Sequence, residues 1–266
     1  MNRVQNQKLI SLRFDKRKIY LRRDVIDDYW VFNSIFYANT YNKLKLKNDD
    51  ILLDIGANIG LVTLLYCEKA SKIIAIEPEP NNFELLKLNL QNNNCKNVIA
   101  INEGVSSERG YISFEHTGGT ATAIPTNAGI KMDTLDNILK EIDVIPTAIK
   151  MDIEGFEGRA LRGFSGYDDL RQIIMEVHSK DLQRDISNLL TNKGFFVEFL
   201  EENFLHRAIL NVLRHPLTFL KNEKIHNYDL SRRYAKYIFG FSKDRPAEYK
   251  TATNNSDIVI LYATKA

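Results

Sequence analysis

The chain has 266 residues, of which 44% are hydrophobic and 26% are charged, and its formal net charge is +2. This is the balance of a globular protein that can bury a full core, and the charge is too small to indicate a nucleic-acid partner by itself. No apolar run approaches the ~18 residues of a membrane span, and the first residues lack the apolar stretch of a signal peptide. Cys67 and Cys95 have no metal-type spacing, so we expect a reducing, cytoplasmic setting.

The first 49 residues precede the main run of alternating strands and helices. Residues 8–23 alternate in polarity around a turn near Asp15, which predicts a pair of strands. Residues 24–41 are rich in aromatic side chains, and we expect a helix there whose aromatics either line a substrate entrance or pack in the core. We assign residues 1–49 to an N-terminal strand pair and helix that pack on the core, and residues 50–266 to the main domain.

The segment Ile51–Gly60, ILLDIGANIG, predicts a strand, a glycine loop and the start of a helix. Glycine lets the backbone of such a loop approach a ligand closely, because no Cβ stands in the way. A second apolar run, 73–76, leads about 20 residues later into Glu77, whose carboxylate can accept both hydroxyls of a ribose. A dinucleotide fingerprint would need glycine at the positions of Asn58 and Leu61, so a nicotinamide cofactor fits poorly.

Asp54 precedes the loop, where its carboxylate could hold the ammonium group of an amino-acid-like ligand. A ribose together with an ammonium-carboxylate end indicates S-adenosyl-L-methionine as the cofactor. The end of a further strand, 98–102, should lie beside the base, because ligands of an open parallel sheet sit at the carboxyl ends of its strands. The predicted cofactor-binding residues are Asp54, Gly56, Ala57, Asn58, Gly60, Glu77, Glu103 and Gly104.

Two later strands, 148–152 and 173–177, end in charged residues that are costly to bury unless they are paired or used. We predict Asp152, Glu154 and His178 as the catalytic residues. Asp152 would act as a base or hold the ammonium group, and His178 has the ordinary pKa of a base at neutral pH. A purely structural histidine is the alternative at that position.

Two other interpretations of this charged region stay open. Lys150 shares a strand face with Asp152 if the side chains alternate, and it could simply neutralise that acid. The catalytic candidates together with Glu176 could also ligate a divalent metal that acidifies a hydroxyl. Sequence spacing does not settle the second point, and we assign no metal ligand.

The remaining stretches are less informative. Residues 110–131 look like a hairpin excursion, within which 116–122 is either a loop that closes over the substrate or a plain surface loop. Residues 201–250 mix basic and aromatic side chains, which suits a phosphate-bearing or nucleic-acid partner, or else a solvated helical insertion or an oligomer contact. A strand at 195–200 precedes that insertion, and 257–262 is the last strand, expected at or near the sheet edge.

The motifs DIGANIG, IEPEPNNFELLKLNLQNN, TLDNI and IKMDIEGFEGRALRGF together resemble the FkbM family of S-adenosylmethionine-dependent methyltransferases over about residues 24–180. The resemblance implies the class I methyltransferase fold, a Rossmann-like α/β fold with a seven-stranded, mostly parallel sheet, helices on both faces and an antiparallel last strand. It also implies methyl transfer, typically to a hydroxyl of a sugar, lipid or polyketide-like molecule. The family's cofactor loop, ribose acid and strand-four motif match the positions Asp54, Gly56, Asn58, Gly60, Glu77, Asp152, Glu154 and Gly155.

The leading hypothesis is an O-methyltransferase that acts on a small molecule, sugar or lipid. An RNA methyltransferase is the second, supported by the basic and aromatic insertion, although KMDIEG stands where base N-methyltransferases carry an Asn-Pro-Pro motif. A non-catalytic module that keeps the nucleoside pocket is the third. The sequence indicates neither the acceptor nor the oligomeric state.

Overall fold

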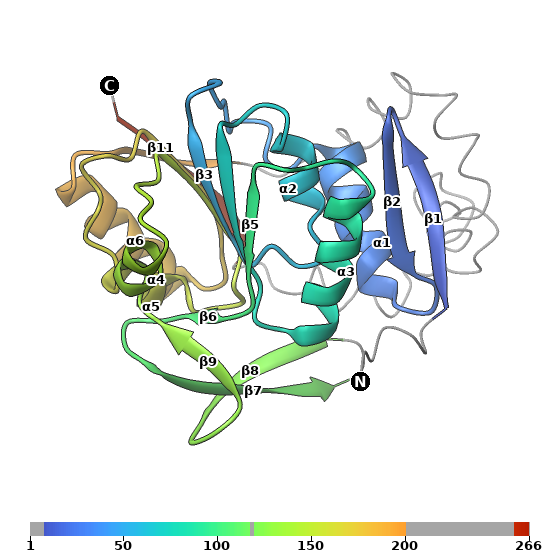
Figure 1. The fold of residues 1–266 in the computed structure, drawn as a ribbon. Coiled ribbons are helices and arrows are strands. Elements are labelled where there is room, and N and C mark those ends of the chain that lie inside the picture. Colours follow the sequence, from blue (N-terminus) through green and yellow to red (C-terminus); the bar gives the residue numbers. More distant parts are fainter. Residues whose placement is uncertain (1–7, 118–119, 201–257, 266) are drawn as a thin grey trace, which may run out of the picture.

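The computed structural model describes residues 8–117, 120–200 and 258–265. The basic and aromatic segment 201–250, to which we assigned a possible partner, therefore lies outside the described residues, as do residues 118–119 of the 116–122 loop. Figure 1 shows a central twisted sheet with helices on both of its faces.

Within the described residues the central sheet has seven strands, and β13 runs antiparallel to the other six. Its core strands are short and almost entirely apolar, as expected for parallel strands that are covered on both faces. In spatial order the strands are β12 (Phe196–Leu200), β13 (Val259–Thr264), β11 (Gln172–Val177), β10 (Ala148–Met151), β3 (Ile51–Ile55), β4 (Lys72–Ile76) and β5 (Val98–Ile101). This topology confirms the predicted seven-stranded, mostly parallel sheet, and it places β13 next to the edge rather than at it.

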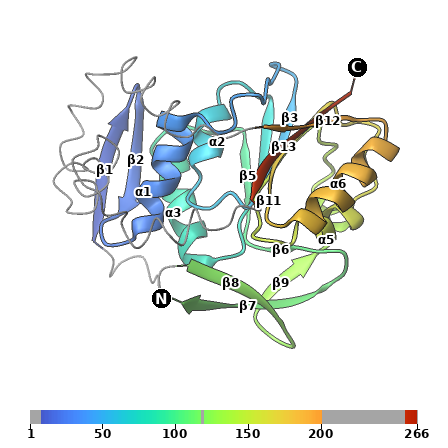
Figure 2. The same cartoon turned by 180° about the vertical axis from the view of Figure 1, so that it is seen from behind.

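Two groups of helices cover the two faces of this sheet (Figures 1 and 2). One face carries α2 (Leu61–Tyr66) and α3 (Pro80–Gln91), and the other carries α4 (Leu135–Glu141), α5 (Glu157–Arg162) and α6 (Lys180–Asn192). Each group buries a separate hydrophobic cluster against the sheet. Within the described ranges, no helix combines the length and the apolar character needed to cross a bilayer.

The N-terminal residues extend the hydrophobic cluster that α2 and α3 bury against the sheet. The antiparallel pair β1 (Leu9–Phe14) and β2 (Arg17–Arg22) lies beyond α3, with α1 (Ile26–Phe32) close by (Figure 1). The single helix predicted over 24–41 is instead α1 followed by a π-helix, η2 (Asn33–Ala38).

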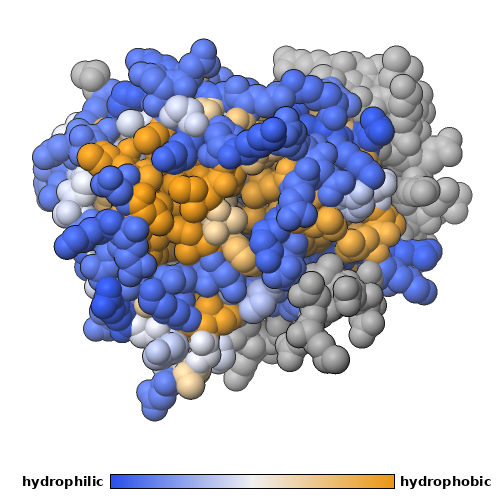
Figure 3. Space-filling model, in the orientation of Figure 1, coloured by the Kyte–Doolittle hydropathy of each residue, from blue (hydrophilic) through white to orange (hydrophobic). Residues whose placement is uncertain are grey.

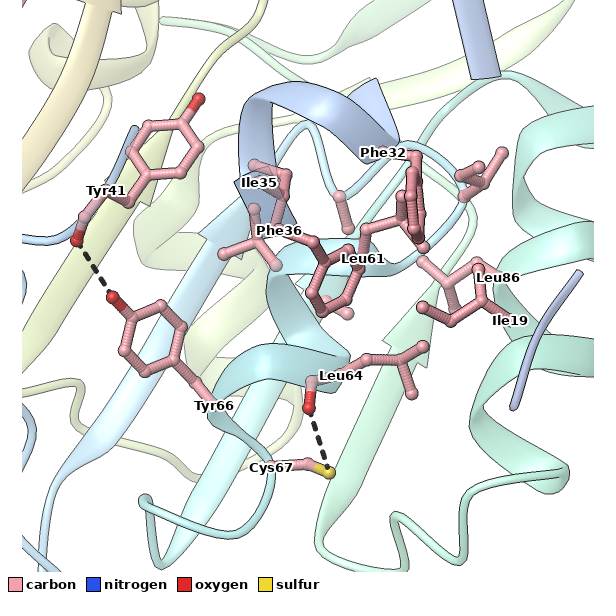
Figure 4. Close-up of a cluster of buried hydrophobic side chains, with 14 of the residues drawn as sticks. Ile19, Phe32, Ile35, Phe36, Tyr41, Leu61, Leu64, Tyr66, Cys67 and Leu86 are labelled. Carbon is pink, nitrogen blue, oxygen red and sulfur yellow. Dashed lines mark hydrogen bonds between the residues drawn. The ribbon is translucent and has the colours of Figure 1, made fainter. Parts of the chain in front are cut away.

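The aromatic side chains of this region pack in the core rather than at an entrance. Phe32 and Phe36 lie beside Leu61 and Leu64 of α2 (Figure 4), and all four are buried. Their burial selects the second of the two roles that we considered for these aromatics.

A second, four-stranded sheet lies at the lower end of β5 (Figure 1). Its order is β6 (Gly104–Val105), β9 (Ile130–Asp133), β7 (Gly110–Thr117) and β8 (Thr120–Thr126). The predicted hairpin excursion is the β7–β8 pair, whose strands run antiparallel. The pairing of β6 and β9 with this hairpin was not foreseen, because a two-residue strand such as β6 leaves no periodic signal.

Cys67 and Cys95 form a disulfide, with their Cα atoms 5.7 Å apart. Cys67 follows α2 and is buried, whereas Cys95 lies in the connection between α3 and β5. The pairing corrects the expectation of two reduced cysteines, which was based on the absence of a metal-type spacing. The two positions are 28 residues apart, and only the packing of α2 beside α3 brings them together.

Candidate active site

The glycine loop after β3 is the first component of the site. Gly56, Asn58 and Gly60 all adopt positive φ, at 72°, 51° and 85°, a region that asparagine and glycine tolerate better than other residues. The amides of Gly56 and Ala57 both donate to the carbonyl of Ile76, at 3.0 Å each. The loop is thereby tied to the end of β4, the neighbouring strand.

Asn89 of α3 supports this loop from behind. Its fully buried side chain accepts a hydrogen bond from the amide of Tyr20 at 2.7 Å and donates one to the carbonyl of Ile59 at 2.9 Å. The side-chain amide of Asn89 therefore joins the helix α3 to the strand pair β1–β2 and to the glycine loop. The N-terminal residues help to shape the loop, although they contribute none of the predicted cofactor-binding residues.

Glu77, the predicted ribose acid, stands directly beside the loop. Its Oε2 accepts the amide of Asn58 and its Oε1 accepts the amide of Glu79, both at 2.8 Å. Burial raises the pKa of Glu77 to about 7, although the two amide hydrogen bonds lower it. Each carboxylate oxygen has a second lone pair, so the same group can hold the loop and still accept a ribose hydroxyl.

Asp54 is fully buried beneath the loop. Its Oδ2 accepts the hydroxyl of Thr63 at 2.6 Å, and its Oδ1 lies 3.4 Å from the ammonium of Lys150. Lys150 also donates to the carbonyl of Gly56 at 2.8 Å. Burial opposes the charge of this lysine, but Asp54, Asp152 and Glu176 raise its pKa.

The nearest carboxylate to Lys150 is thus Asp54, and the lysine braces the glycine loop rather than pairing first with Asp152. Contact between Asp54 and a cofactor stays a prediction, since one carboxylate oxygen accepts the hydroxyl of Thr63 and the other faces the ammonium of Lys150.

The three predicted catalytic residues meet at the ends of β10 and β11. Nε2 of His178 lies 3.8 Å from Oδ1 of Asp152 and 3.4 Å from Oε2 of Glu154. Glu154 lies in the turn after β10, with φ at +54°, and its side chain is 75% exposed. The structure therefore brings together all three residues that the sequence singled out for catalysis.

Glu157 completes this cluster, and we had not assigned it a role. It is fully buried at the start of α5, and its Oε1 lies 2.9 Å from Nδ1 of His178. The same oxygen accepts the amides of Ile153 and Gly155. Burial lowers the pKa of His178, but the hydrogen bond to Glu157 and the nearby acids raise it to about 9. The ordinary histidine pKa, on which we based the prediction of a neutral base, does not apply here.

The two parts of the site are in contact through the backbone. A Cβ on Gly56 would overlap the carbonyl oxygen of Asp152, and the amide of Asp152 donates to the carbonyl of Ile55 at 3.0 Å. The glycine loop and the acidic cluster are therefore held at the same end of adjacent strands, which is where ligands bind in open α/β sheets.

Glu103 and Gly104 lie further out along this edge. Glu103 forms an ion pair with Lys131 at 3.0 Å, and Gly104 is buried at the start of β6. Their predicted contact with the base of a cofactor stays a prediction.

A shallow hollow of about 400 Å³ lies elsewhere, near the amino end of β5, between that strand and α3. Its lining includes Leu90, Cys95 and Val98. Figure 3 shows apolar side chains exposed across the middle of the face that Figure 1 presents. None of the predicted site residues lines this hollow, so it is separate from the site described above.

Comparisons with known proteins agree with this arrangement. The family model of the methyltransferase FkbM domain matches residues 54–213. The hexuronic acid methyltransferase AglP of Haloferax volcanii is 29% identical over 166 residues, which cover 60% of this chain and 69% of that protein. The methyltransferase sdnD of Sordaria araneosa is 26% identical over 223 residues, with 67% and 86% covered.

Among solved structures, the methyltransferase FkbM of Methylobacillus flagellatus is 20% identical, with a TM-score of 0.47. That likeness covers 65% of this chain and 45% of the other, and it is too distant to carry an argument about function. The family match spans more than half of the chain and includes both the glycine loop and the acidic cluster. The protein therefore belongs to the FkbM methyltransferase family, and it is a methyltransferase.

Proposed function

We propose that the protein binds S-adenosyl-L-methionine along the glycine loop and transfers its methyl group to a hydroxyl oxygen of a sugar or other glycan. The observation that carries the proposal is the contact between Gly56 and Asp152, because it sets the loop and the acidic cluster side by side. Glu77 would accept the ribose hydroxyls, and the glycine loop would lie along the rest of the cofactor.

Methyl transfer from a sulfonium is an in-line displacement, in which most of the catalysis is alignment of the acceptor with the methyl carbon. The acceptor oxygen attacks that carbon, and the carbon–sulfur bond breaks with its electron pair left on sulfur. The hydroxyl proton passes to a carboxylate, for which Asp152 is the best candidate because a protonated His178 cannot accept it. The products are the methyl ether, S-adenosylhomocysteine and a protonated carboxyl group.

A sugar acceptor is favoured by two considerations. The relative AglP is described as a hexuronic acid methyltransferase. In addition, the cluster presents an exposed carboxylate, Glu154, and a partly exposed one, Asp152, and carboxylates are good acceptors for sugar hydroxyls. The RNA hypothesis rests on residues 201–250, outside the described part of the chain, and no described residue adds to it.

The test begins with calorimetric titration of S-adenosylmethionine and S-adenosylhomocysteine, with NAD as the control. We expect the two adenosyl ligands alone to bind. A panel of uronic acids, neutral sugars, glycans and RNA is then offered with a methyl-labelled cofactor. Label in a sugar ether supports the proposal, whereas label in RNA or cofactor binding without transfer to any acceptor contradicts it.

A further inference from the structure

The acidic cluster has the composition of a cation site, and the backbone explains why its members converge. Asp152 follows β10 and His178 follows β11, and these parallel strands pair residue Met151 with Met175. One ligand atom each from Asp152, Glu154 and His178 lies within 4.8 Å of the others. Around a cation with ligands at about 2.1–2.2 Å, neighbouring donor atoms are about 3 Å apart and opposite ones about 4.4 Å apart. The spacing in the structure needs only small side-chain adjustments to reach that range.

Glu157 fixes the orientation of His178 and is not itself one of the three candidate ligands. Its buried carboxylate is held by two backbone amides and meets Nδ1 of the imidazole at 2.9 Å. A carboxylate can only accept, so Nδ1 carries the hydrogen and Nε2 is directed at Asp152 and Glu154. Histidines that ligate metals almost always have such a partner on the other nitrogen, which sets the tautomer and the ring orientation.

A carboxylate oxygen without a hydrogen-bond partner, Oδ1 of Asp152, gives a second observation beside the spacing of the three residues. Nε2 faces two carboxylate oxygens, and a cation that replaced its proton would contact all three atoms. The distances of 3.4 and 3.8 Å exceed the ~2.7–2.9 Å of a charge-assisted hydrogen bond. Oδ1 of Asp152 is shielded from solvent and, among the described residues, has no hydrogen-bond partner. A bound cation would satisfy that oxygen and the imidazole together.

We propose that Asp152, Glu154 and His178 form a binding site for a divalent cation of the Mg²⁺ and Mn²⁺ class, with Glu157 as its positioning residue. Two carboxylates and one imidazole favour these ions over thiophilic metals. The exposed side of Glu154 leaves coordination positions open to water or to the acceptor. The role of the ion in the reaction rests on the proposed function: it binds the acceptor hydroxyl and makes its proton easier to remove.

Binding of Mn²⁺ alone tests the site without any turnover. The purified chain is titrated with Mn²⁺ and followed by electron paramagnetic resonance, and the bound signal is examined for coupling to an imidazole nitrogen. We expect sub-millimolar binding with nitrogen coupling in the wild type. Binding should weaken at least tenfold in D152N, the nitrogen coupling should be lost in H178Q, and E157Q should lose about 10–100-fold in affinity.

The matched control is D181N, which removes an exposed carboxylate at the start of α6, and it should bind Mn²⁺ like the wild type. Equal binding by D152N and the wild type, or no binding below millimolar Mn²⁺, overturns the site.

Titration of S-adenosylhomocysteine in metal-free buffer separates the two proposals. Cofactor binding without Mn²⁺ binding refutes only the cation site, whereas Mn²⁺ binding without cofactor binding refutes the proposed function. Thermal unfolding of each variant shows whether a loss of Mn²⁺ binding comes from a loss of the folded structure.

Discussion

The backbone of Gly56 lies directly against the carbonyl group of Asp152, with no room for a side chain between them. This contact joins the strand β3, which leads into the glycine loop, to the strand β10, which leads into the acidic cluster. The positive φ of Gly56 and its lack of a Cβ are both required at this point. The proposed cofactor and acceptor regions are thus separated by little more than one peptide group.

Replacement of Gly56 by alanine should abolish cofactor binding and lower stability by several kcal/mol, because both the conformation and the close approach are lost. Gly194 provides the matched control. It also has a positive φ, at 83°, but among the described residues no heavy atom lies within 4 Å of its Cβ position. G194A should therefore cost only the ~1–2 kcal/mol of backbone strain. Urea unfolding and calorimetric titration measure both effects, and equal losses in the two variants would argue against the contact.

The pKa of Glu77, near 7, should make cofactor affinity depend on pH. Protonation turns one of the two oxygens into an O–H donor and removes the charge, so the group becomes a weaker acceptor for the ribose hydroxyls. Affinity for S-adenosylhomocysteine should therefore fall about tenfold per pH unit below about pH 7 and level off above it. E77Q should bind weakly without this dependence, and it also corrects for titration of the ligand itself. A flat profile in the wild type would show that Glu77 is not the ribose acceptor.

The free energy of unfolding should depend on pH in the opposite direction, because of the same carboxyl group of Glu77. The folded pKa of Glu77 lies above its ordinary value of 4.5, so the folded state holds the proton more tightly than the unfolded state. The resulting stabilisation is fully present below about pH 4.5 and is lost as the pH rises through about 7. Replacement by glutamine should remove this component from the pH profile of urea unfolding, and an unchanged difference between pH 5 and pH 8 would contradict it.

The buried pair of Lys150 and Asp54 should matter more for folding than any surface pair. Substitution K150M leaves the carboxylate of Asp54 buried without a cation, which should cost about 3–5 kcal/mol. The double variant D54N/K150M should lose less than the sum of the single variants, because no charge is left behind. The exposed pair of Lys16 and Glu68 is the comparison, for which K16M should cost less than ~1 kcal/mol. Urea unfolding of the four variants gives these values.

Removal of the charge at Asp152 should separate chemistry from cofactor binding. In D152N, turnover should fall by at least ~100-fold because the proton acceptor is lost. Affinity for S-adenosylhomocysteine should change little, since the glycine loop is untouched. D168N removes a fully exposed carboxylate as the control. Steady-state kinetics and calorimetry give the two numbers, and wild-type turnover in D152N would remove this residue from the mechanism.

The disulfide between Cys67 and Cys95 can be checked by thiol counting. Protein unfolded without reductant should show no reactive thiol, since no free cysteine is present. The bond closes a loop of 28 residues, so the C67A/C95A variant should lose about 3–4 kcal/mol of stability in the chain-entropy account. Two reactive thiols in the purified protein would instead support the reducing environment expected from the sequence.

Much of the fold could be predicted because the local signals agree with the tertiary structure. The helix α6 spans residues 180–192 and begins after a serine, a common residue at a helix start, and the hydroxyl of this Ser179 accepts the amide of Leu182. The π-helix η2 was missed, because burial of Ile35, Phe36 and Tyr37 governs its geometry rather than any local propensity. The disulfide depends on a contact between segments that no sequence pattern links.

The sequence singled out three members of the acidic cluster but missed Glu157, and it gave none of the contacts between their side chains. Asp152, Glu154 and His178 could be named because charged residues at the ends of buried strands need an explanation. Side-chain rotamers decide two contacts that the sequence did not give. Lys150 points toward Asp54, and Glu157 forms a hydrogen bond with His178. The first is set by the close passage of the glycine loop and the second by the turn at Glu154. Spacing along the chain carries no information about either.

The position of β13 between β11 and β12 also bears on how the protein is made. Within the described residues, β13 is the only sheet neighbour of β12. Leu200 of β12 pairs with Ile260 of β13. During synthesis β12 therefore has no strand to pair with on either backbone edge until the ribosome has completed β13. Such an exposed edge invites pairing with other chains. We therefore expect nascent chains that stop short of β13 to depend on chaperones far more than the finished protein does.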